Sequence, residues 1–349
     1  MNQEFCIETT PEHPTCHASS ICQLPSGDLL ACCYTGKQEG SPDQVIIGSR
    51  YTTQEGRWSH PEVWVSVANR AAGNPRIFMG PEDGEVWLVA PVDYGAWCSG
   101  GTWLFLKRSR DEGRTWSDLE LLHFQPGILG KNKPLVEGPF CILPVEYEVP
   151  WSTCFLRTED AGKTWEVCGD LGREAGAHLI QPSLVRLSDG RLVVYMRSQE
   201  DRIFVSYSHD NGKTWSHAKP TCVPNNNSGL DIARLRSGNL VLICNPTTSN
   251  AMLDKLNQGW PAHMPVDFDT WGLRTPLDIL VSVDEGVTWK RAIRLEDGPS
   301  VYSYPAVIQS DDGLIHITYT YERRAIKHVA LSEDELMEGL ADNKQKGLQ

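Results

Sequence analysis

The sequence has no long apolar segment and too few basic residues to balance its acidic ones. None of its apolar stretches approaches the roughly 20 residues that cross a bilayer, and residues 1–16 have neither the basic start nor the apolar run of a secretion signal. With 32 Lys and Arg against 45 Asp and Glu, the formal charge is -13, which would repel nucleic acids and anionic membrane surfaces. We therefore expect a cytoplasmic protein with no nucleic-acid partner and no membrane partner.

The 11 cysteines do not have the spacing of a metal site or of a disulfide framework. Cys32 and Cys33 are adjacent, but the sequence has no Cys-x-x-Cys pair and no Cys/His group at zinc spacing. An odd number of cysteines in a chain without a secretion signal is typical of reduced, mostly buried thiols. No metal and no organic cofactor is expected.

The length and composition allow one large domain. The 349 residues are 40% apolar and include 12 Trp, which is enough for a sizeable core. All-β and α/β-barrel designs are the ones that commonly remain single domains at this length. We expect a single domain over residues 1–349, with its core at about residues 15–332.

A repeated motif, S/T-x-D-x-G-x-T-W, predicts the fold. Its Asp folds back onto backbone amides, its Gly takes a positive φ, and its Thr begins a strand whose Trp packs inward, which together describe a rigid hairpin turn. The four copies in register are residues 109–116, 158–165, 208–215 and 282–289, and a decayed fifth lies at residues 55–58.

A second set of turns alternates with these boxes. Each has a glycine before an alternating apolar run, and the glycines are mostly about 50 residues apart. They are Gly27, Gly84, Gly138, Gly190, Gly238 and Gly313. Six turns and five boxes predict an all-β, six-bladed β-propeller with four antiparallel strands per blade.

The two ends of the chain are expected to finish this fold. The N-terminal segment should complete the sixth blade and close the ring. Ser332 to Glu335 form a capping-box pattern, which predicts a short C-terminal helix within residues 333–349. A solvated tail is the alternative for the C-terminal segment.

The boxes resemble the Asp-boxes of the sialidase superfamily and its BNR-repeat proteins, and the resemblance runs from about His17 to Leu331. It implies a propeller with a carbohydrate site at the centre of one face. Asp-boxes lie on the blade periphery and also occur in propellers without sialidase activity, so the chemistry has to be argued from other residues.

Polar residues precede the predicted inner strands and would surround the central axis. Turns favour Gly, Asn, Asp and Pro but do not require His, Lys, Gln or paired Tyr. Their convergence predicts a site, while hydrogen bonding of strand ends is the alternative for any single member. The candidates are His17, Asn74, Lys131, Lys133, Gln181, Asn227, Asp231, Tyr302 and Tyr304, joined by Asp43, Arg197 and Asn245 from loops on the same face.

The resemblance assigns catalytic roles to three of these residues. In sialidases a Tyr of the last blade is the nucleophile, a carboxylate polarises it, and an Asp in a first-blade loop is the acid and base. By this resemblance Tyr302 is the nucleophile, Asp231 its partner and Asp43 the acid/base group. A packed aromatic ring, a strand cap and a loop cap are the respective alternatives.

The arginine clamp of sialidases is only partly present. In that family three Arg hold the substrate carboxylate through paired hydrogen bonds. Arg274 resembles one of them, whereas His17 and Asn245 stand where others are expected. Arg197 and Lys131 or Lys133 could supply compensating charge. The expected substrate is therefore a terminal sialic acid or a related acidic sugar.

Three functions remain open at this point. The leading one is a retaining exo-glycoside hydrolase. The set of His17, Tyr302 and Arg274 is also similar to that of some propeller polysaccharide lyases, and an imidazole with an ordinary pKa near 6.5 suits acid–base work at a uronic-acid linkage. A glycan-binding propeller without catalysis is the third.

Residues 247–274 lengthen the fifth unit and include Trp271. Long insertions in regular repeats usually lie on the binding face, and a Trp face suits sugar C–H surfaces. We expect a lid or a subsite wall that binds carbohydrate. A contact in a homo-oligomer is the alternative.

Overall fold

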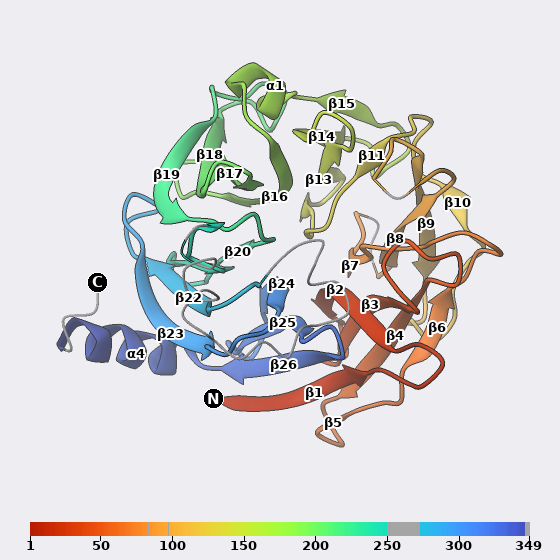
Figure 1. Cartoon of the computed structure of the whole chain (residues 1–349), viewed down its shortest axis with the longest axis horizontal. Coiled ribbons are helices and arrows are strands. Elements are labelled where there is room, and N and C mark those ends of the chain that lie inside the picture. The colour runs from red at the N-terminus through yellow and green to blue at the C-terminus, as the bar shows by residue number, and fades with distance from the viewer. Residues whose placement is uncertain (82–83, 97, 250, 252–272, 346–349) are drawn as a thin grey trace.

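The computed structural model describes residues 1–349 except 82–83, 97, 250, 252–272 and 346–349. Figure 1 shows its strands arranged as sheets around a centre, with the chain passing from one sheet to the next. The predicted all-β class is confirmed. The helices in the described ranges are short, α1 (Leu171–Ala175) and α4 (Glu333–Gln345), and none is both long and apolar enough to cross a membrane.

The strands, in chain order, are β1 (Asn2–Glu8), β2 (Thr15–Gln23), β3 (Leu29–Gly36), β4 (Val45–Thr52), β5 (Arg57–Trp58), β6 (Glu62–Val65), β7 (Arg76–Met79), β8 (Val86–Asp93), β9 (Thr102–Ser109), β10 (Glu120–Leu121), β11 (Ile128–Leu129), β12 (Leu135–Glu137), β13 (Phe140–Tyr147), β14 (Ser152–Thr158), β15 (Glu166–Cys168), β16 (Leu179–Arg186), β17 (Leu192–Ser198), β18 (Arg202–Ser208), β19 (Lys219–Pro224), β20 (Asp231–Arg234), β21 (Leu240–Cys244), β22 (Leu277–Ser282), β23 (Lys290–Glu296), β24 (Tyr302–Gln309), β25 (Ile315–Tyr321) and β26 (Ala325–Leu331).

These strands form five hydrogen-bonded sheets. Three have four strands, in the orders β1-β26-β25-β24, β10-β9-β8-β7 and β20-β21-β22-β23, and a fourth has the order β2-β3-β4-β5 with β6 on β4. The fifth has nine strands, in which an antiparallel group of β11 to β15 meets an antiparallel group of β16 to β19 through one parallel pair, Ser152 with Leu179. The sequence predicted six separate four-stranded units, so this sheet differs from the expectation.

The N-terminal strand lies in the same sheet as the last strands of the chain. β1 pairs antiparallel with β26, from Asn2 opposite Ala330 to Glu8 opposite Ala325. The expectation that the N-terminal segment completes the last unit is confirmed.

The repeated boxes form hydrogen-bonded turns of the predicted kind. Thr115 donates to Asp111 from its backbone nitrogen at 2.8 Å and from its hydroxyl at 2.6 Å, and the backbone nitrogen of Gly113 donates to the Ser109 hydroxyl at 2.7 Å. Glu112 and Gly113 both have positive φ, 59° and 81°. Hydrogen bonds from Thr115 hold the pKa of Asp111 well below its ordinary range. Matching bonds surround Asp160, Asp210 and Asp284.

Each complete box packs against the sheet or strand group that precedes it in the chain. A Cβ added to Gly286 would lie 2.1 Å from the Tyr195 hydroxyl oxygen, and one on Gly212 would lie 2.3 Å from the Ile142 Cδ1. The ring of Trp215 stacks on Phe155 with centroids 4.3 Å apart. The box therefore requires glycine for two reasons, the positive φ of the turn and the close packing against the preceding strands.

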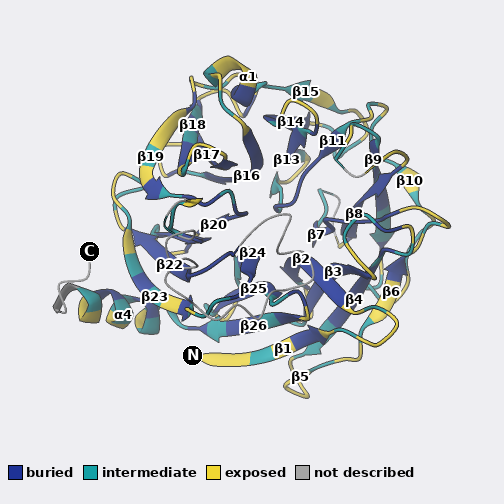
Figure 2. Ribbon diagram, viewed as in Figure 1, coloured by how far each residue is buried: buried dark blue, intermediate teal, exposed yellow. Residues whose placement is uncertain are grey.

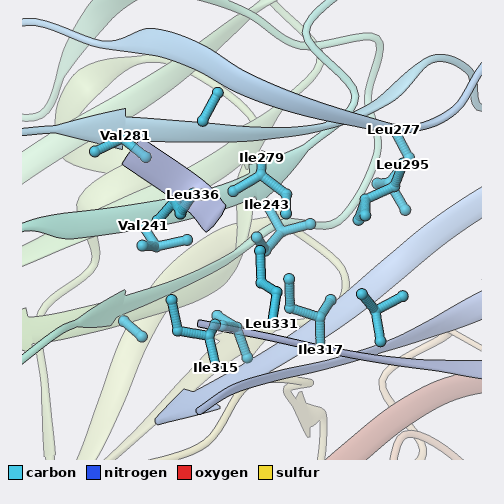
Figure 3. Close-up of a cluster of buried hydrophobic side chains, with 14 of the residues drawn as sticks. Val241, Ile243, Leu277, Ile279, Val281, Leu295, Ile315, Ile317, Leu331 and Leu336 are labelled. Atoms are coloured by element: carbon cyan, nitrogen blue, oxygen red, sulfur yellow. The ribbon is translucent and has the colours of Figure 1, made fainter. Parts of the chain in front are cut away.

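The inner strands are buried and the outer edges are exposed (Figure 2). The largest apolar cluster joins the sheet of β20 to β23, the sheet of β24 to β26 and α4 (Figure 3). Leu336 of α4 is buried in this cluster near Val241 and Ile279. Ser332 and Glu335 exchange backbone and side-chain hydrogen bonds at 3.2 and 2.8 Å, so the predicted capping box and helix are confirmed.

Candidate functional site

The inner strands share a backbone irregularity where they begin. Non-glycine residues have positive φ at this place in five strands or the turns before them, and three of the strands, β2, β16 and β24, also shift register there. The residues are Ala18, Asn74, Gln181, Asn227 and Tyr304. Such backbone costs energy unless the surroundings hold it, and it is common at functional sites. The irregularity therefore indicates a functional site at this end of the sheets.

Tyr304 is the residue at which several sheets meet. Its phenol oxygen accepts hydrogen bonds from Arg197 Nη1 at 2.9 Å and from Gln181 Nε2 at 2.6 Å. Arg197 also donates to the Gln181 amide oxygen at 3.0 Å. Because an arginine can only donate, this bond fixes the amide orientation, and the Gln181 nitrogen must face Tyr304. The phenol oxygen therefore stands between two donors.

A neutral histidine lies against this tyrosine. The rings of His17 and Tyr304 have centroids 4.0 Å apart, and His17 Nδ1 is 2.8 Å from the Thr320 hydroxyl. Burial, followed by the positive charges of Arg323, Arg274, Lys131 and Arg197, holds the pKa of His17 well below its ordinary value. The imidazole is therefore uncharged near neutral pH.

Buried cations surround the His17–Tyr304 pair. The Arg274 guanidinium carbon is 5.2 Å from the Tyr304 ring centroid, and the Lys131 ammonium is 5.9 Å from it. Burial lowers the pKa of Lys131 to about 7 and that of Arg274 to about 10. Several buried positive charges at one place favour the binding of an anion.

A cleft of about 440 Å³, counting its part open to solvent, lies beside Tyr304. Its lining is polar on several sides and carries carboxylates as well as an arginine. The lining residues are Glu39, Asn74, Cys98, Leu129, Glu146, Glu148, Trp151, Ile180, Gln181, Arg197 and Tyr304.

The carboxylates of this cleft differ in charge state. Burial alone would raise the pKa of Glu39, but the charge of Arg323 and its hydrogen bond at 2.9 Å outweigh burial and leave this pKa lowered. Burial raises the pKa of Glu146 to about 7 and also raises that of Glu148. Glu39 is therefore ionised, while Glu146 holds a proton for much of the time near neutral pH.

Tyr302 and Asp231 are not brought together. The Tyr302 hydroxyl is 3.5 Å from a Glu322 carboxylate oxygen, and its ring is 5.2 Å from that of Tyr321, within the apolar cluster of β20 to β26. Asp231 accepts hydrogen bonds from Lys133 at 2.7 Å, from the Ser183 hydroxyl and from the backbone nitrogen of Val307. The tyrosine at the centre is Tyr304, two residues further along β24.

Several candidate ligands instead tie strand ends to one another. Lys131 donates to the carbonyl of Pro305, Lys133 donates to that of Ile232 at 2.8 Å, and Asn132 donates to those of Gln181 and Pro182. Asn245 donates to the carbonyls of Pro276 and Tyr302 at 2.7 and 2.9 Å. For Lys131, Lys133, Asn245 and Asp231, hydrogen bonding of strand ends accounts for these contacts.

The remaining predicted residues lie in different places. Asp43 accepts a hydrogen bond from the Lys37 backbone nitrogen at 3.1 Å in the loop between β3 and β4, and it does not line the cleft. Asn74 lines the cleft, and Asn227 accepts a hydrogen bond from Arg197 Nε at 2.8 Å. Trp271, with most of the predicted insertion, lies outside the described residues.

The sequence interpretation did not name Glu39, Glu146, Glu148, Trp151 or Arg323. All five lie in or beside connections between the second and third strands of a sheet or strand group, namely β3 to β4, β13 to β14 and β25 to β26. The rule that selected Asp43, Arg197 and Asn245 from such connections would have found the residues of the β13–β14 and β25–β26 connections, had it been applied to every unit. Glu39 lies in the same loop as Asp43.

No group of three His, Cys, Asp or Glu side chains within the described ranges is arranged to hold a metal ion. The polar groups of the site include arginine, lysine, histidine, tyrosine, amide and carboxylate side chains. Such a set can bind an anionic sugar and move protons without a metal.

Comparison with known proteins identifies the family. Residues 27–317 match the BNR repeat-like domain, and the chain belongs to this family. The anhydrosialidase of Macrobdella decora is 23% identical over 239 residues, which cover 62% of this chain and 29% of that protein. The predicted membership of the sialidase-like BNR-repeat superfamily is confirmed.

Solved sialidase structures have a similar fold. A Hadza microbial sialidase superposes with a TM-score of 0.74 at 17% identity, covering 93% of this chain and 66% of that one. The intramolecular trans-sialidase of Ruminococcus gnavus, in complex with oseltamivir carboxylate, gives a TM-score of 0.71 at 15% identity, covering 96% and 98%. At these identities the comparison shows a sialidase-like fold.

Proposed function

We propose that the chain is a sialidase-like exo-glycoside hydrolase that releases a terminal sialic acid or a related acidic sugar. The observation that carries the proposal is that the buried Arg197 and Arg274 both contact Tyr304, beside a cleft that Arg197 and Tyr304 line. A buried cluster of arginines suits a carboxylate, whose planar oxygens match the guanidinium fork. The similarity to sialidases supports the same substrate class.

We also interpret the five sheets as six propeller blades of four antiparallel strands each. The nine-stranded sheet would supply two blades, with the Ser152–Leu179 pair as a link between them. The ring-like arrangement in Figure 1 supports this interpretation.

In this proposal Tyr304, rather than Tyr302, is the nucleophile of a retaining reaction. Its oxygen attacks the anomeric carbon while Arg197 and Gln181 hold that oxygen in place. Glu39, which is ionised and lines the same cleft, accepts the phenol proton. Water then releases the sugar from the tyrosine with retained configuration.

Two tyrosine variants test this assignment. Release of the aryl group is measured from nitrophenyl glycosides of sialic acid and other acidic sugars, with wild type, Tyr304→Phe and Tyr302→Phe compared. Tyr304→Phe should lower kcat by about 10³-fold or more, and Tyr302→Phe should stay near wild type because its hydroxyl lies among Glu322 and Tyr321. Near-normal turnover by Tyr304→Phe would remove it from the mechanism.

A second candidate function is a lyase that acts at a uronic-acid linkage. It is favoured by the neutral imidazole of His17 against Tyr304, and by the amide of Gln181 at the place where a carboxylate would polarise the tyrosine. Elimination leaves a new carbon–carbon double bond, which absorbs ultraviolet light, whereas hydrolysis leaves a saturated sugar. Binding of the sugar without either product would indicate a glycan-binding protein.

A further inference from the structure

We propose that Glu146, near the end of β13, is the group that exchanges a proton with the glycosidic oxygen. The sequence assigned this role to Asp43. The inference rests on the proposed hydrolase function and names the acid/base residue of the same site.

Glu146 lies within the hydrogen-bonded centre of the site. Its carboxylate accepts the backbone N–H of Gln181 at 3.3 Å, and the side chain of Gln181 donates to the Tyr304 oxygen at 2.6 Å. Glu146 lines the cleft together with Tyr304 and Arg197, and its own exposure is 2%. Gln181 thus links the Glu146 carboxylate to the Tyr304 phenol, and water has little access to Glu146.

The other carboxylates near the cleft are less suited to this role. Asp43 is held by the Lys37 backbone on a loop and does not line the cleft. Glu39 is paired with Arg323 and ionised, so it has no proton to give. Glu148 lines the cleft, but the backbone of Gly100 at 2.7 Å and the hydroxyl of Thr102 both donate to it.

The charges that face Glu146 come from several strands. Arg76 of β7 and Arg197 of β17 favour its ionised form, and Glu148 on the following turn opposes it, while the thiols of Cys98 and Cys154 lie nearby. Burial outweighs them and raises the pKa of Glu146 to about 7. Two carboxyl groups with pKa values pushed apart, Glu146 upward and Glu39 downward, are typical of an acid and a base in one site.

The proposed step conserves protons and electrons. The Tyr304 oxygen forms a bond to the anomeric carbon as its proton passes to Glu39. The electron pair of the breaking carbon–oxygen bond goes to the leaving oxygen, which takes the proton of Glu146. In the second step the Glu146 carboxylate takes a proton from water as the water oxygen displaces Tyr304, and the phenol oxygen recovers its proton from Glu39.

The test compares leaving groups of different acidity on whichever acidic sugar the wild type hydrolyses. A nitrophenol leaves without help, whereas methanol needs a proton. Glu146→Gln should lower kcat/KM, which reports the steps up to loss of the leaving group, by about 10²–10⁴-fold for the methyl glycoside and much less for the nitrophenyl glycoside. The second step is common to both substrates and affects kcat for both. Glu148→Gln makes the same chemical change in the same cleft, and it should affect both substrates by the same factor.

The wild type provides an independent measurement if Glu146→Gln fails to fold. Its kcat/KM for the methyl glycoside should fall as pH rises through about 7, and its kcat/KM for the nitrophenyl glycoside should not. Equal losses of kcat/KM for both substrates in Glu146→Gln, or a leaving-group dependence of kcat/KM in Glu39→Gln instead, would overturn the assignment of Glu146 and leave the hydrolase intact. Absence of any turnover by the wild type would overturn the proposed function and this step with it.

Discussion

Replacing Asp231 by Asn should weaken the fold rather than the chemistry. Asp231 is 1% exposed and lies at the start of β20. Its carboxylate receives Lys133 at 2.7 Å, the Ser183 hydroxyl at 2.6 Å and the Val307 backbone nitrogen at 2.8 Å. These partners belong to β16, β24 and the segment before β12, so one side chain joins four parts of the ring.

The size of the effect follows from these contacts. Lys133 and the Val307 N–H both donate to Oδ2, and the Ser183 hydroxyl donates to Oδ1. An Asn that keeps its oxygen at the Oδ2 position turns its amide nitrogen to Ser183, so the Ser183 hydroxyl proton loses its acceptor and Lys133 loses its anion. A charge-assisted hydrogen bond is worth about 1.5–3 kcal/mol, and a buried donor left without an acceptor, here the Ser183 hydroxyl, costs about 1–3 kcal/mol. We expect a loss of about 3–5 kcal/mol in the free energy of unfolding.

Thermal unfolding measures this loss. At about 2.1 cal/mol/K of unfolding entropy per residue, the 349 residues give a fall in Tm of about 4–7 °C. Asp189→Asn is the matched control, because its ion pair with Arg191 is exposed and its loss should leave Tm close to that of wild type. A Tm of Asp231→Asn within about 1 °C of wild type, together with lost turnover, would refute the structural role and return Asp231 to the mechanism.

Two further predictions concern stability. Gly286→Ala and Gly190→Ala both place a side chain at a φ of +89°, which should cost about 1–2 kcal/mol of stability. Only the new methyl group of Gly286→Ala meets the buried Tyr195, so this variant should lose about 1–3 kcal/mol more in thermal unfolding. Equal losses in the two variants would contradict the close packing of Gly286 against Tyr195. Burial lowers the pKa of both His316 and His328 to about 4, below the unfolded value of about 6.5, so protonation favours the unfolded chain. Stability should fall as pH drops from about 6.5 towards 4, by up to about 3 kcal/mol for each His. The Tm of His328→Gln should depend less on pH over this range, and a slope equal to that of wild type would contradict the assignment.

The turns that repeat along the chain could be predicted because their physics is local. The side-chain hydrogen bonds of Ser109 and Asp111 join residues two or four positions apart, and the turn itself requires a positive φ at its glycine. The capping box at Ser332 is local in the same way. These features led to the all-β class, the sialidase-like resemblance and the C-terminal helix.

The choice between Tyr302 and Tyr304 needed the structure. Both lie on β24 and differ by two positions, so a regular strand would place them on the same face. The left-handed residue at Tyr304 and the register shift between Ser303 and Ala306 break that alternation. Tyr302 then packs among apolar side chains, while Tyr304 meets Arg197 and Gln181.

The sequence by itself determined the repeating turns, the strand content and the end of the inner strands at which polar side chains would gather. The tertiary structure decided which of those side chains face the cleft and which tie the sheets together. Lys131, Lys133 and Asp231 bond to strands remote in sequence, and Glu146 has its raised pKa through burial between other sheets. Such contacts depend on packing between distant residues, which local patterns do not encode.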